Sequence, residues 1–266
     1  MILLEAKKLS KHFMGLKAVE QVDMQVYERE ILGIIGPNGA GKTTFFNLCS
    51  CTIPATSGEI LLCGKNITGC HAEDVAQMGI ARTFQNIKLF MHMTVAENVA
   101  VGFHIQTKTN ILDAILHTKR YKNDELLIKQ KTEEILKRLD LYEYKDYPAA
   151  NLSYGMQRKV EIARTMALEP KVLLLDEPAA GMNPNETKEL LSFVKKLNTD
   201  GYTIVVIEHD MKFIMNLCDR IVVLNHGEKI CEGTPDVVKN SRQVQEAYFG
   251  KGLAAGIAPA EGEAHA

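Results

Sequence analysis

The segment from Gly36 to Thr44 reads GPNGAGKTT and has the residue types needed to hold a polyphosphate. Glycines allow the backbone to turn its N–H groups inward around an anion. Lys42 supplies a point charge for the terminal phosphates, and Thr43 supplies a hydroxyl for Mg²⁺. A helix expected from Thr43 to Cys51 adds the positive end of its dipole. The pattern predicts a nucleotide-phosphate site made of Gly36, Asn38, Gly39, Ala40, Gly41, Lys42, Thr43 and Thr44.

Two adjacent carboxylates, Asp176 and Glu177, end a second apolar run that begins at Val172. In proteins with such a phosphate loop, the first acid at this kind of strand end holds Mg²⁺ through water. The second acid is placed to orient and polarise an attacking water molecule. An ordinary acidic strand end is the alternative, but its combination with the phosphate loop favours catalysis. Together the two segments predict an enzyme that hydrolyses a nucleotide with Mg²⁺ as its cofactor.

The elements that must position these groups alternate between strands and helices, which is typical of a parallel sheet with right-handed crossovers. Apolar runs with the length of buried strands lie at Ile31–Ile35, Lys171–Leu175 and Thr203–Ile207. Leu3–Leu9 and Val19–Val26 alternate apolar and polar residues, as antiparallel strands at an edge do.

Shorter elements complete the expected order. Ser57-Gly58 is predicted to form a turn before a strand from Glu59 to Leu62. Another strand is expected at Ile80–Thr83, and Asn225–Gly227 has the signal of a hairpin turn. Pro184 suits the first turn of a helix that runs to Asn198.

The segment from Thr94 to Asp146 is helical in its periodicity and more charged than the rest. Lys42 and Asp176 also lie further apart than their counterparts in small kinases and GTPases, which indicates a subdomain inserted between them. Within it, the stretch from His104 to Lys131 is rich in lysine and arginine. A solvated helix face is the simpler explanation, and contact with a membrane surface is the alternative.

The composition limits the other possibilities. The 266 residues are 46% hydrophobic, enough for one large domain or two small ones, and the net charge is −2. No nucleic-acid partner is expected, because no block of like charges is present. No stretch approaches the ~20 apolar residues of a membrane helix. The six cysteines form no CxxC pair and, without a secretion signal, are expected to be reduced, packed thiols in the cytosol.

The helical insert ends in LSYGMQR, from Leu152 to Arg158, and there the chain resembles the ATP-binding cassette (ABC) ATPases. The family signature reads LSGGQ, and this chain departs from it at Tyr154 and Met156. The resemblance implies that Ser153 and the backbone at Gly155 face the γ-phosphate of a nucleotide. Met156 lacks the hydrogen-bonding groups of a glutamine. The positions that match are Leu152, Ser153, Gly155, Gln157 and Arg158.

Other positions resemble the family in the same order along the chain. Gln85, in RTFQN, resembles the glutamine that joins the metal site to the helical subdomain; a polar residue at a strand end is the alternative. His209 resembles the histidine that contacts the γ-phosphate, although a lone histidine is more often a surface residue. Phe13 resembles the aromatic residue that stacks on adenine, with a core phenylalanine as the alternative. Asn183 stands where the family usually has aspartate, so communication between two ATP sites is expected to be altered. The resemblance therefore implies catalytic roles for Glu177, His209 and Gln85, and Mg²⁺ contacts from Thr43, Gln85 and Asp176.

The resemblance also implies an α/β fold, that of an ABC-type P-loop ATPase. Such a fold has a RecA-like parallel-sheet core, an antiparallel β edge and an inserted helical subdomain. The core is expected to comprise residues 1–86 and 166–250, with the helical signature subdomain at 87–165. Residues 251–266, rich in glycine and alanine, are expected to form a flexible tail.

In this family the signature of one cassette closes over the ATP of another, so the resemblance implies a homo- or heterodimer of cassettes. RTFQNIKLF, EPAAGMNP, VIEHDM and EAYFG, with the insert at Thr107–Lys122, are most similar to cassette subunits of bacterial branched-chain amino-acid importers. Such a subunit lies on the cytoplasmic face of the inner or plasma membrane with two transmembrane permease subunits, and a separate substrate-binding protein completes the assembly. The apolar stretch Lys88–Thr94 would receive a short permease helix or pack within the helical subdomain.

Three alternatives stay open at this point. A cassette for lipid or polysaccharide export shares the same order of elements. A soluble ABC-type ATPase acting on nucleic acid or ribosomes usually has two cassettes in one chain or a long coiled-coil insertion, neither of which is present. A regulatory module that only binds ATP would tend to lose Glu177 and His209.

Overall fold

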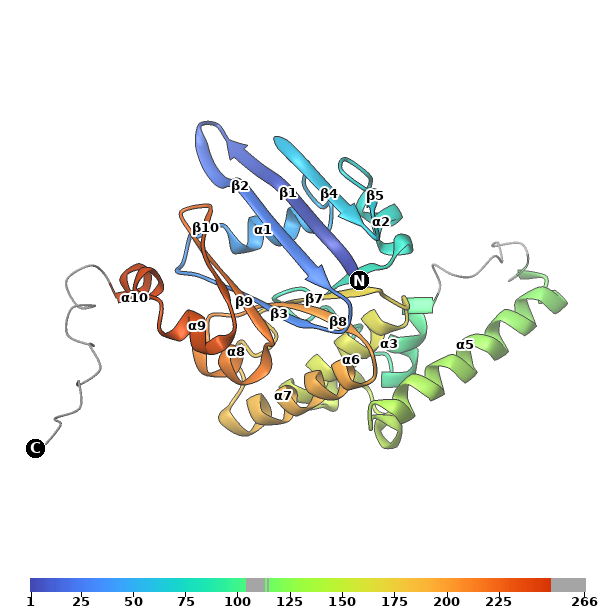
Figure 1. The fold of residues 1–266 in the computed structure, drawn as a ribbon. Helices are drawn as coiled ribbons and strands as arrows, with labels where there is room; N and C mark the ends of the chain where they lie inside the picture. The colour runs from blue at the N-terminus through green and yellow to red at the C-terminus, as the bar shows by residue number, and fades with distance from the viewer. Residues whose placement is uncertain (104–112, 114, 250–266) are drawn as a thin grey trace, which may run out of the picture.

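The computed structural model describes residues 1–103, 113 and 115–249. Two β-sheets form the centre of the described chain, and helices pack around the second of them (Figure 1). The predicted insert at Thr107–Lys122 lies partly outside the described residues, and the predicted tail at 251–266 lies entirely outside them.

The first sheet is antiparallel and has the strand order β2-β1-β4-β5. Its strands are β1 (Ile2–Phe13), β2 (Leu16–Tyr27), β4 (Ser57–Leu62) and β5 (Lys65–Asn66). The predicted strands at 3–9 and 19–26 are therefore confirmed and extend further in both directions.

The prediction of a turn at Ser57-Gly58 is wrong, because both residues belong to β4. Ser57 pairs with Ser10 of β1 across an irregular register. Gly58 has a φ of 89°, and a Cβ there would lie 2.4 Å from the carbonyl oxygen of Lys8. The glycine thus allows two backbones to approach closely at a bulge, a position that sequence alone does not separate from a turn.

The second sheet has the order β10-β9-β3-β8-β7-β6, and all neighbouring pairs are parallel except β9 with β10. This confirms the predicted parallel core with a closing hairpin. Because parallel strands point the same way, the carboxyl ends of β3, β6, β7 and β8 meet at one edge of the sheet. Its strands are β3 (Ile31–Ile35), β6 (Ile80–Arg82), β7 (Val172–Asp176), β8 (Thr203–Ile207), β9 (Arg220–Asn225) and β10 (Glu228–Gly233).

The helices fall into two groups along the chain. One group lies between β6 and β7 and includes the long helix α5, which projects away from the sheets (Figure 1). It comprises α3 (Val95–Val101), α5 (Lys119–Arg138), η2 (Tyr142–Tyr144), η3 (Ala149–Asn151) and α6 (Tyr154–Met166). The others are α1 (Lys42–Cys49), α2 (Ala72–Met78), α7 (Pro184–Thr199), α8 (Met211–Leu217), α9 (Pro235–Lys239) and α10 (Arg242–Phe249).

The central strands β3, β7, β8 and β9 are buried on both faces, and alternate residues of each belong to different cores. In β8, Val205 and Ile207 join α1 and the antiparallel sheet in one apolar cluster. Ile204 and Val206 join α6, α7 and α8 in the other. A strand buried on both sides reads as a continuous apolar run, which is why β3, β7 and β8 are so clear in the sequence. None of the described helices is both long and apolar enough to cross a membrane.

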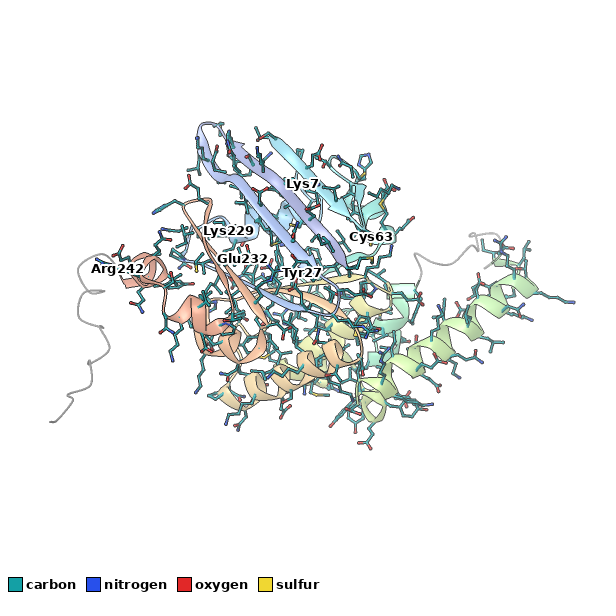
Figure 2. The ribbon with its side chains drawn as sticks, in the orientation of Figure 1. Lys7, Tyr27, Cys63, Lys229, Glu232 and Arg242 are labelled. Atoms are coloured by element: carbon teal, nitrogen blue, oxygen red, sulfur yellow. The ribbon has the colours of Figure 1, made fainter. Side chains whose placement is uncertain are left out.

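The prediction that all cysteines are packed is wrong for Cys63, which is exposed between β4 and β5 (Figure 2). Cys63 and Gly64 both have positive φ, at 49° and 78°. Two such residues form the tight turn that suits a two-residue hairpin, and a side chain in that turn points into solvent. Cys49 and Cys218 are buried as predicted.

The difference in burial between two leucines predicts unequal effects for the same substitution. Leu197 on α7 is fully buried, whereas Leu127 on α5 is half exposed. Leu197→Ala is expected to lower the free energy of unfolding by about 3 kcal/mol, because it leaves a cavity. Leu127→Ala should change it by less than about 1 kcal/mol. Urea unfolding followed by circular dichroism measures both, and equal losses would contradict this account of the core.

Candidate ATP-binding and catalytic site

The loop between β3 and α1 has the conformation of a phosphate cradle. Gly36, Gly39 and Gly41 all have positive φ, at 155°, 79° and 98°. A Cβ on Gly36 would lie 2.1 Å from the Leu224 carbonyl oxygen of β9, so this end of the loop is held against the sheet. A Cβ on Gly39 would meet nothing within 4 Å. A Cβ on Gly41 would lie 2.2 Å from the Ala18 carbonyl oxygen, so the loop is fixed by the fold at both ends and open in its middle, where its backbone can face an anion.

Lys42, the first residue of α1, is buried beneath this loop. Its Nζ donates to the carbonyl oxygens of Gly36 and Pro37, at 2.7 and 3.0 Å. Burial lowers the pKa of Lys42, and the negative charge of Glu177 opposes that shift. The lysine of the loop and the acid that follows β7 are thus electrostatic neighbours, although they are far apart in the sequence.

Asp176, at the carboxyl end of β7, is held by an arginine that the sequence analysis did not single out. Arg82 Nη2 lies 2.6 Å from Asp176 Oδ2, and both side chains are largely buried. Arg82 Nη1 donates to Asn47 Oδ1 of α1 at 2.6 Å. One guanidinium therefore connects the helix of the phosphate loop to the acidic end of β7, and it fixes one carboxylate oxygen of Asp176.

Glu177 is the point at which the predicted catalytic side chains meet. Gln85 Nε2 donates to Glu177 Oε2 at 3.1 Å. Nδ1 of His209 lies 3.9 Å from the same oxygen. Glu177 has a φ of 44°, which is uncommon for a residue with a side chain and is often found at functional sites. Its N–H donates to the carbonyl of Ile207 at 2.9 Å, which anchors it to the end of β8.

Glu208 is a third carboxylate at this edge, and the sequence analysis missed it. Its side chain is buried and accepts hydrogen bonds from the N–H groups of Ala179 and His209, at 2.7 and 3.2 Å. Burial raises the pKa of Glu208, and these two backbone hydrogen bonds act against the shift. Glu208 thus ties the loop after Glu177 to the loop that carries His209. An acid placed directly after a buried strand was the available signal.

The predicted signature residues lie at the start of α6. Ser153 is the N-cap, and its Oγ accepts from the N–H of Met156 at 3.3 Å. The N–H of Gly155 donates to Glu186 of α7 at 3.1 Å, so this amide already has a partner within the chain. Among the described residues, the hydrogen bonds of Ser153 stay within the first turn of α6, and none joins it to the phosphate loop.

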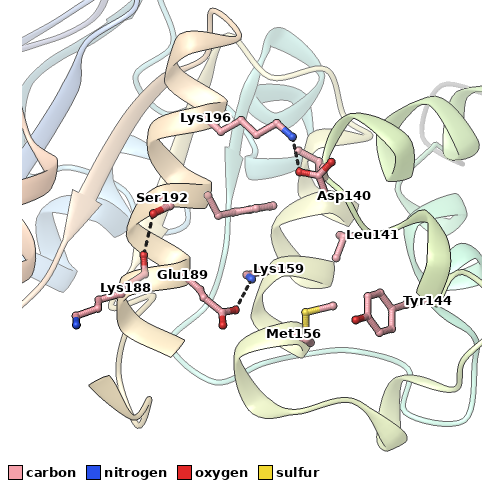
Figure 3. A pocket seen from close by; sticks show the side chains of 11 residues that line it. Asp140, Leu141, Tyr144, Met156, Lys159, Lys188, Glu189, Ser192 and Lys196 are labelled. Carbon is pink, nitrogen blue, oxygen red and sulfur yellow. Dashed lines mark hydrogen bonds and ion pairs between the residues drawn. The ribbon is translucent and has the colours of Figure 1, made fainter. Parts of the chain in front are cut away.

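Met156 lines a cavity of about 540 Å³ between α6, α7 and the segment after α5 (Figure 3). Tyr144 and Leu141 line the same cavity. Met156 also packs against the apolar cluster that includes α6 and α7. The departure from glutamine at this position therefore supplies apolar packing between the helical insert and α7. Lys159 and Glu189 also line the cavity, and Lys159 Nζ lies 2.9 Å from Glu189 Oε2 (Figure 3).

The remaining predicted site residues differ in their exposure, and in the described part of the chain no hydrogen bond joins their side chains to Glu177. Phe13 ends β1 with 44% of its surface exposed, so the alternative of a core phenylalanine is wrong. Asn38 and Thr43 are exposed, Thr44 is half-buried, and Ala40 is buried in the loop. The oxygen atoms of Thr43, Gln85 and Asp176 are of the chemical class that Mg²⁺ prefers, so the donor set fits this ion.

Asn183 has a structural role that the sequence did not reveal. It is the N-cap of α7, and its Oδ1 accepts from the N–H groups of Asn185 and Glu186, both at 3.0 Å. Glu186 completes a capping box by accepting from the N–H of Asn183 at 3.1 Å. An amide oxygen serves here as well as a carboxylate, since both are good N-cap acceptors.

Comparison with known proteins agrees with this geometry. A family model described as "ABC transporter" matches residues 19–180, and one described as "Branched-chain amino acid ATP-binding cassette transporter" matches residues 228–254. The high-affinity branched-chain amino acid transport ATP-binding protein LivG of Escherichia coli (strain K12) is 43% identical over 250 residues. That alignment covers 94% of this chain and 98% of LivG.

Two solved structures are also similar. The ADP conformation of an ATP-binding cassette of an ABC transporter has a TM-score of 0.82 and 32% identity, covering 94% of this chain and 100% of that one. A dimeric, post-hydrolysis cassette bound to ADP and Pi has a TM-score of 0.70 and 26% identity, covering 88% and 99%. The chain belongs to the ABC transporter family and is an ATP-hydrolysing cassette that powers transport.

Proposed function

We propose that this chain hydrolyses Mg²⁺-ATP at the edge where β3, β6, β7 and β8 end, and that Glu177 is its catalytic carboxylate. The observation that carries the proposal is the convergence on Glu177. Gln85 donates to its carboxylate, His209 lies beside the same oxygen, and its charge acts on Lys42. These groups come from four separate parts of the chain, and each is of the type that phosphoryl transfer to water requires.

In this proposal each residue has a distinct task. Glu177 orients the attacking water and accepts its proton, because it follows β7 at the same edge of the sheet as the phosphate cradle. His209 donates to the γ-phosphate and is exposed enough to reach it. Lys42 exchanges its bonds to the loop carbonyls for bonds to the β- and γ-phosphates. Phe13 supplies an exposed ring on which adenine stacks.

Mg²⁺ belongs to the same proposal. Thr43, Gln85 and Asp176 would hold it, with Arg82 fixing the orientation of the Asp176 carboxylate. When bound, the ion would neutralise charge on the phosphate oxygens and so favour transfer of the γ-phosphoryl group. Arg82 holds the Asp176 carboxylate in one orientation before the ion arrives, because a guanidinium binds a carboxylate through fixed geometry.

The working unit is proposed to be a head-to-tail pair of cassettes. Support comes from Ser153, whose described hydrogen bonds are all local and leave its outer face available to a second copy. The similarity to a dimeric cassette points the same way. In the pair, Ser153 of each copy contacts the nucleotide held by the other copy's Lys42. The subdomain that carries Ser153 is taken as residues 87–165, and the core as 1–86 with 166–250.

The transported class is proposed to be branched-chain or other hydrophobic amino acids, taken up by an importer. LivG is named a branched-chain amino acid transport ATP-binding protein, and residues 228–254 match a model named for the same class. That C-terminal match favours import over lipid or polysaccharide export. We propose that the chain lies at the inner face of the membrane, bound to two permease subunits that work with a separate substrate-binding protein.

The contact with a permease is proposed to lie at the segment after Gln85. Phe90 is 50% exposed and Met91 40%, whereas Leu89 packs against the apolar core. Exposed apolar side chains on a segment directly connected to Gln85 suit the groove for a short helix.

Lys42→Ala tests the phosphate cradle. Loss of a charge-assisted contact to phosphate is expected to weaken ATP binding by about ten- to a hundredfold, because such bonds contribute about 1.5–3 kcal/mol. Equilibrium binding of a fluorescent ATP analogue measures the change. Lys65→Ala, an exposed lysine on β5, is the control and should bind as the wild type does. Unchanged affinity of Lys42→Ala would argue against the cradle.

Glu177→Gln tests the catalytic carboxylate. An amide keeps the shape but does not accept the proton of water, so turnover should fall by about a hundredfold or more while ATP binding is kept. With ATP bound and uncleaved, the variant is expected to elute as a dimer in size-exclusion chromatography. Glu228→Gln, on the exposed side of β10, should do neither. A monomeric Glu177→Gln protein with normal phosphate release would refute the role.

Phe90→Asp tests the permease groove. A charge on this exposed apolar patch should prevent a helix from docking, since the carboxylate would lose its hydration. Capture of the tagged chain from native membranes in detergent, with identification of the proteins retained, is the measurement. The wild type is expected to retain two membrane permeases and the variant to lose them. Met14→Asp, in the exposed turn between β1 and β2, is the control, and equal retention by all three proteins would remove this groove.

A further inference from the structure

A buried ion pair lies on one face of the signature helix α6. Arg158 and Glu161 are three residues apart, and their side chains are 0% and 1% exposed. Arg158 Nη1 lies 2.7 Å from Glu161 Oε2. Burial raises the pKa of Glu161, and the positive charge of Arg158 acts against that shift. Neither residue belongs to the cluster around Glu177.

Both side chains also bind the main chain of residues 84–88, the segment that contains Gln85. Arg158 donates to the carbonyl oxygens of Phe84 and Gln85, at 2.7 Å each. Glu161 Oε1 accepts from the N–H of Lys88 at 3.2 Å. In the described part of the chain, residues 84–88 make no backbone–backbone hydrogen bond. The main chain of this segment is therefore held to α6 by two side chains of that helix.

The same helix begins at Ser153, its N-cap. Ser153 and Arg158 are separated by little more than one helical turn, or about 8 Å along the axis. An α-helix is stiff over that length, so a displacement of α6 moves both its capping serine and the main chain that it holds. Replacing a buried ion pair by apolar residues often leaves stability unchanged, which makes position a better explanation for this pair than stability.

We propose that Arg158 and Glu161 are positioning residues that make Gln85 move together with the signature helix. The inference rests on the proposed function, in which Ser153 contacts the nucleotide of the second copy and Gln85 serves the nucleotide of its own copy. Binding of Ser153 to one ATP fixes α6, and α6 fixes Gln85 beside Glu177 at the other ATP. The two sites of the pair then hydrolyse ATP cooperatively, through a connection that runs inside each chain.

The test replaces the pair by apolar residues of similar size, as Arg158→Met/Glu161→Leu. The double change leaves no uncompensated buried charge, so the protein is expected to fold. Its affinity for ATP should equal that of the wild type, because no residue of the cradle is changed. The turnover rate should fall by about tenfold or more, as is typical when a supporting contact of a catalytic group is removed. The Hill coefficient for ATP should fall from above one to one.

The matched control is Lys159→Met/Glu189→Leu, which removes the neighbouring ion pair between α6 and α7 with the same replacements. Neither residue of that pair has a described hydrogen bond or ion pair with residues 84–88, so the turnover rate and Hill coefficient should stay at their wild-type values. A second variant, Arg158→Lys, keeps the charge beside Glu161 but replaces the forked guanidinium with a single ammonium. Its turnover rate should lie between those of the wild type and the double variant. If the double variant does not fold, the turnover rate of Arg158→Lys tests the proposal instead.

Several outcomes would overturn the inference. Wild-type turnover and Hill coefficient in folded Arg158→Met/Glu161→Leu, or in Arg158→Lys, would show that the pair does not position Gln85. A lower melting temperature with unchanged kinetics per folded molecule would assign the pair a purely structural role. If the wild type itself neither binds nor hydrolyses ATP, the proposed function fails and this inference fails with it; an active wild type with unaffected variants rejects this inference alone.

Discussion

The parallel pairing of β3 with β8, of β8 with β7 and of β7 with β6 is the constraint on which the rest of the structure depends. Strands that run in the same direction bring their carboxyl ends to one edge. The phosphate loop, the Asp176-Glu177 pair, Glu208 with His209, and Gln85 all lie at the carboxyl ends of these strands or in the loops that follow them. Residues that are far apart along the chain meet there because the sheet is buried on both faces and its register is fixed by two apolar cores.

Each buried charge at or near this edge has a partner, and the partners connect different elements. Lys42 is held by loop carbonyls, Arg82 joins α1 to Asp176, and Arg158 joins α6 to the Gln85 segment. A buried charge without such a partner is expensive, so each contact restricts where its element can lie. The polar network thus fixes the relative positions of elements that apolar packing alone leaves approximate.

The departures from the family signature have local explanations in packing. Met156 fills apolar space between the helical insert and α7, and Asn183 caps α7 with an oxygen that aspartate would also provide. Glu186 connects the regions around these two departures. It belongs to the Asn183 capping box, and it also accepts a hydrogen bond from the N–H of Gly155, the residue before Met156. The start of the signature helix and the start of α7 are consequently held together.

The sequence by itself determined the phosphate loop, the paired acids, the buried strands and the order of the family motifs, because these are local patterns with a fixed spacing. It also indicated Gln85 and His209, but only through their order in a family set. Whether Phe13 was buried or exposed, and whether Gly58 lay in a turn or a strand, depended on neighbours from other strands. Arg82, Glu208 and the pair of Arg158 with Glu161 have no distinctive local pattern, since an arginine or glutamate in a sequence is most often a solvated surface residue. Their burial and their hydrogen-bond and ion-pair partners come only from the tertiary structure, and these contacts determine their roles.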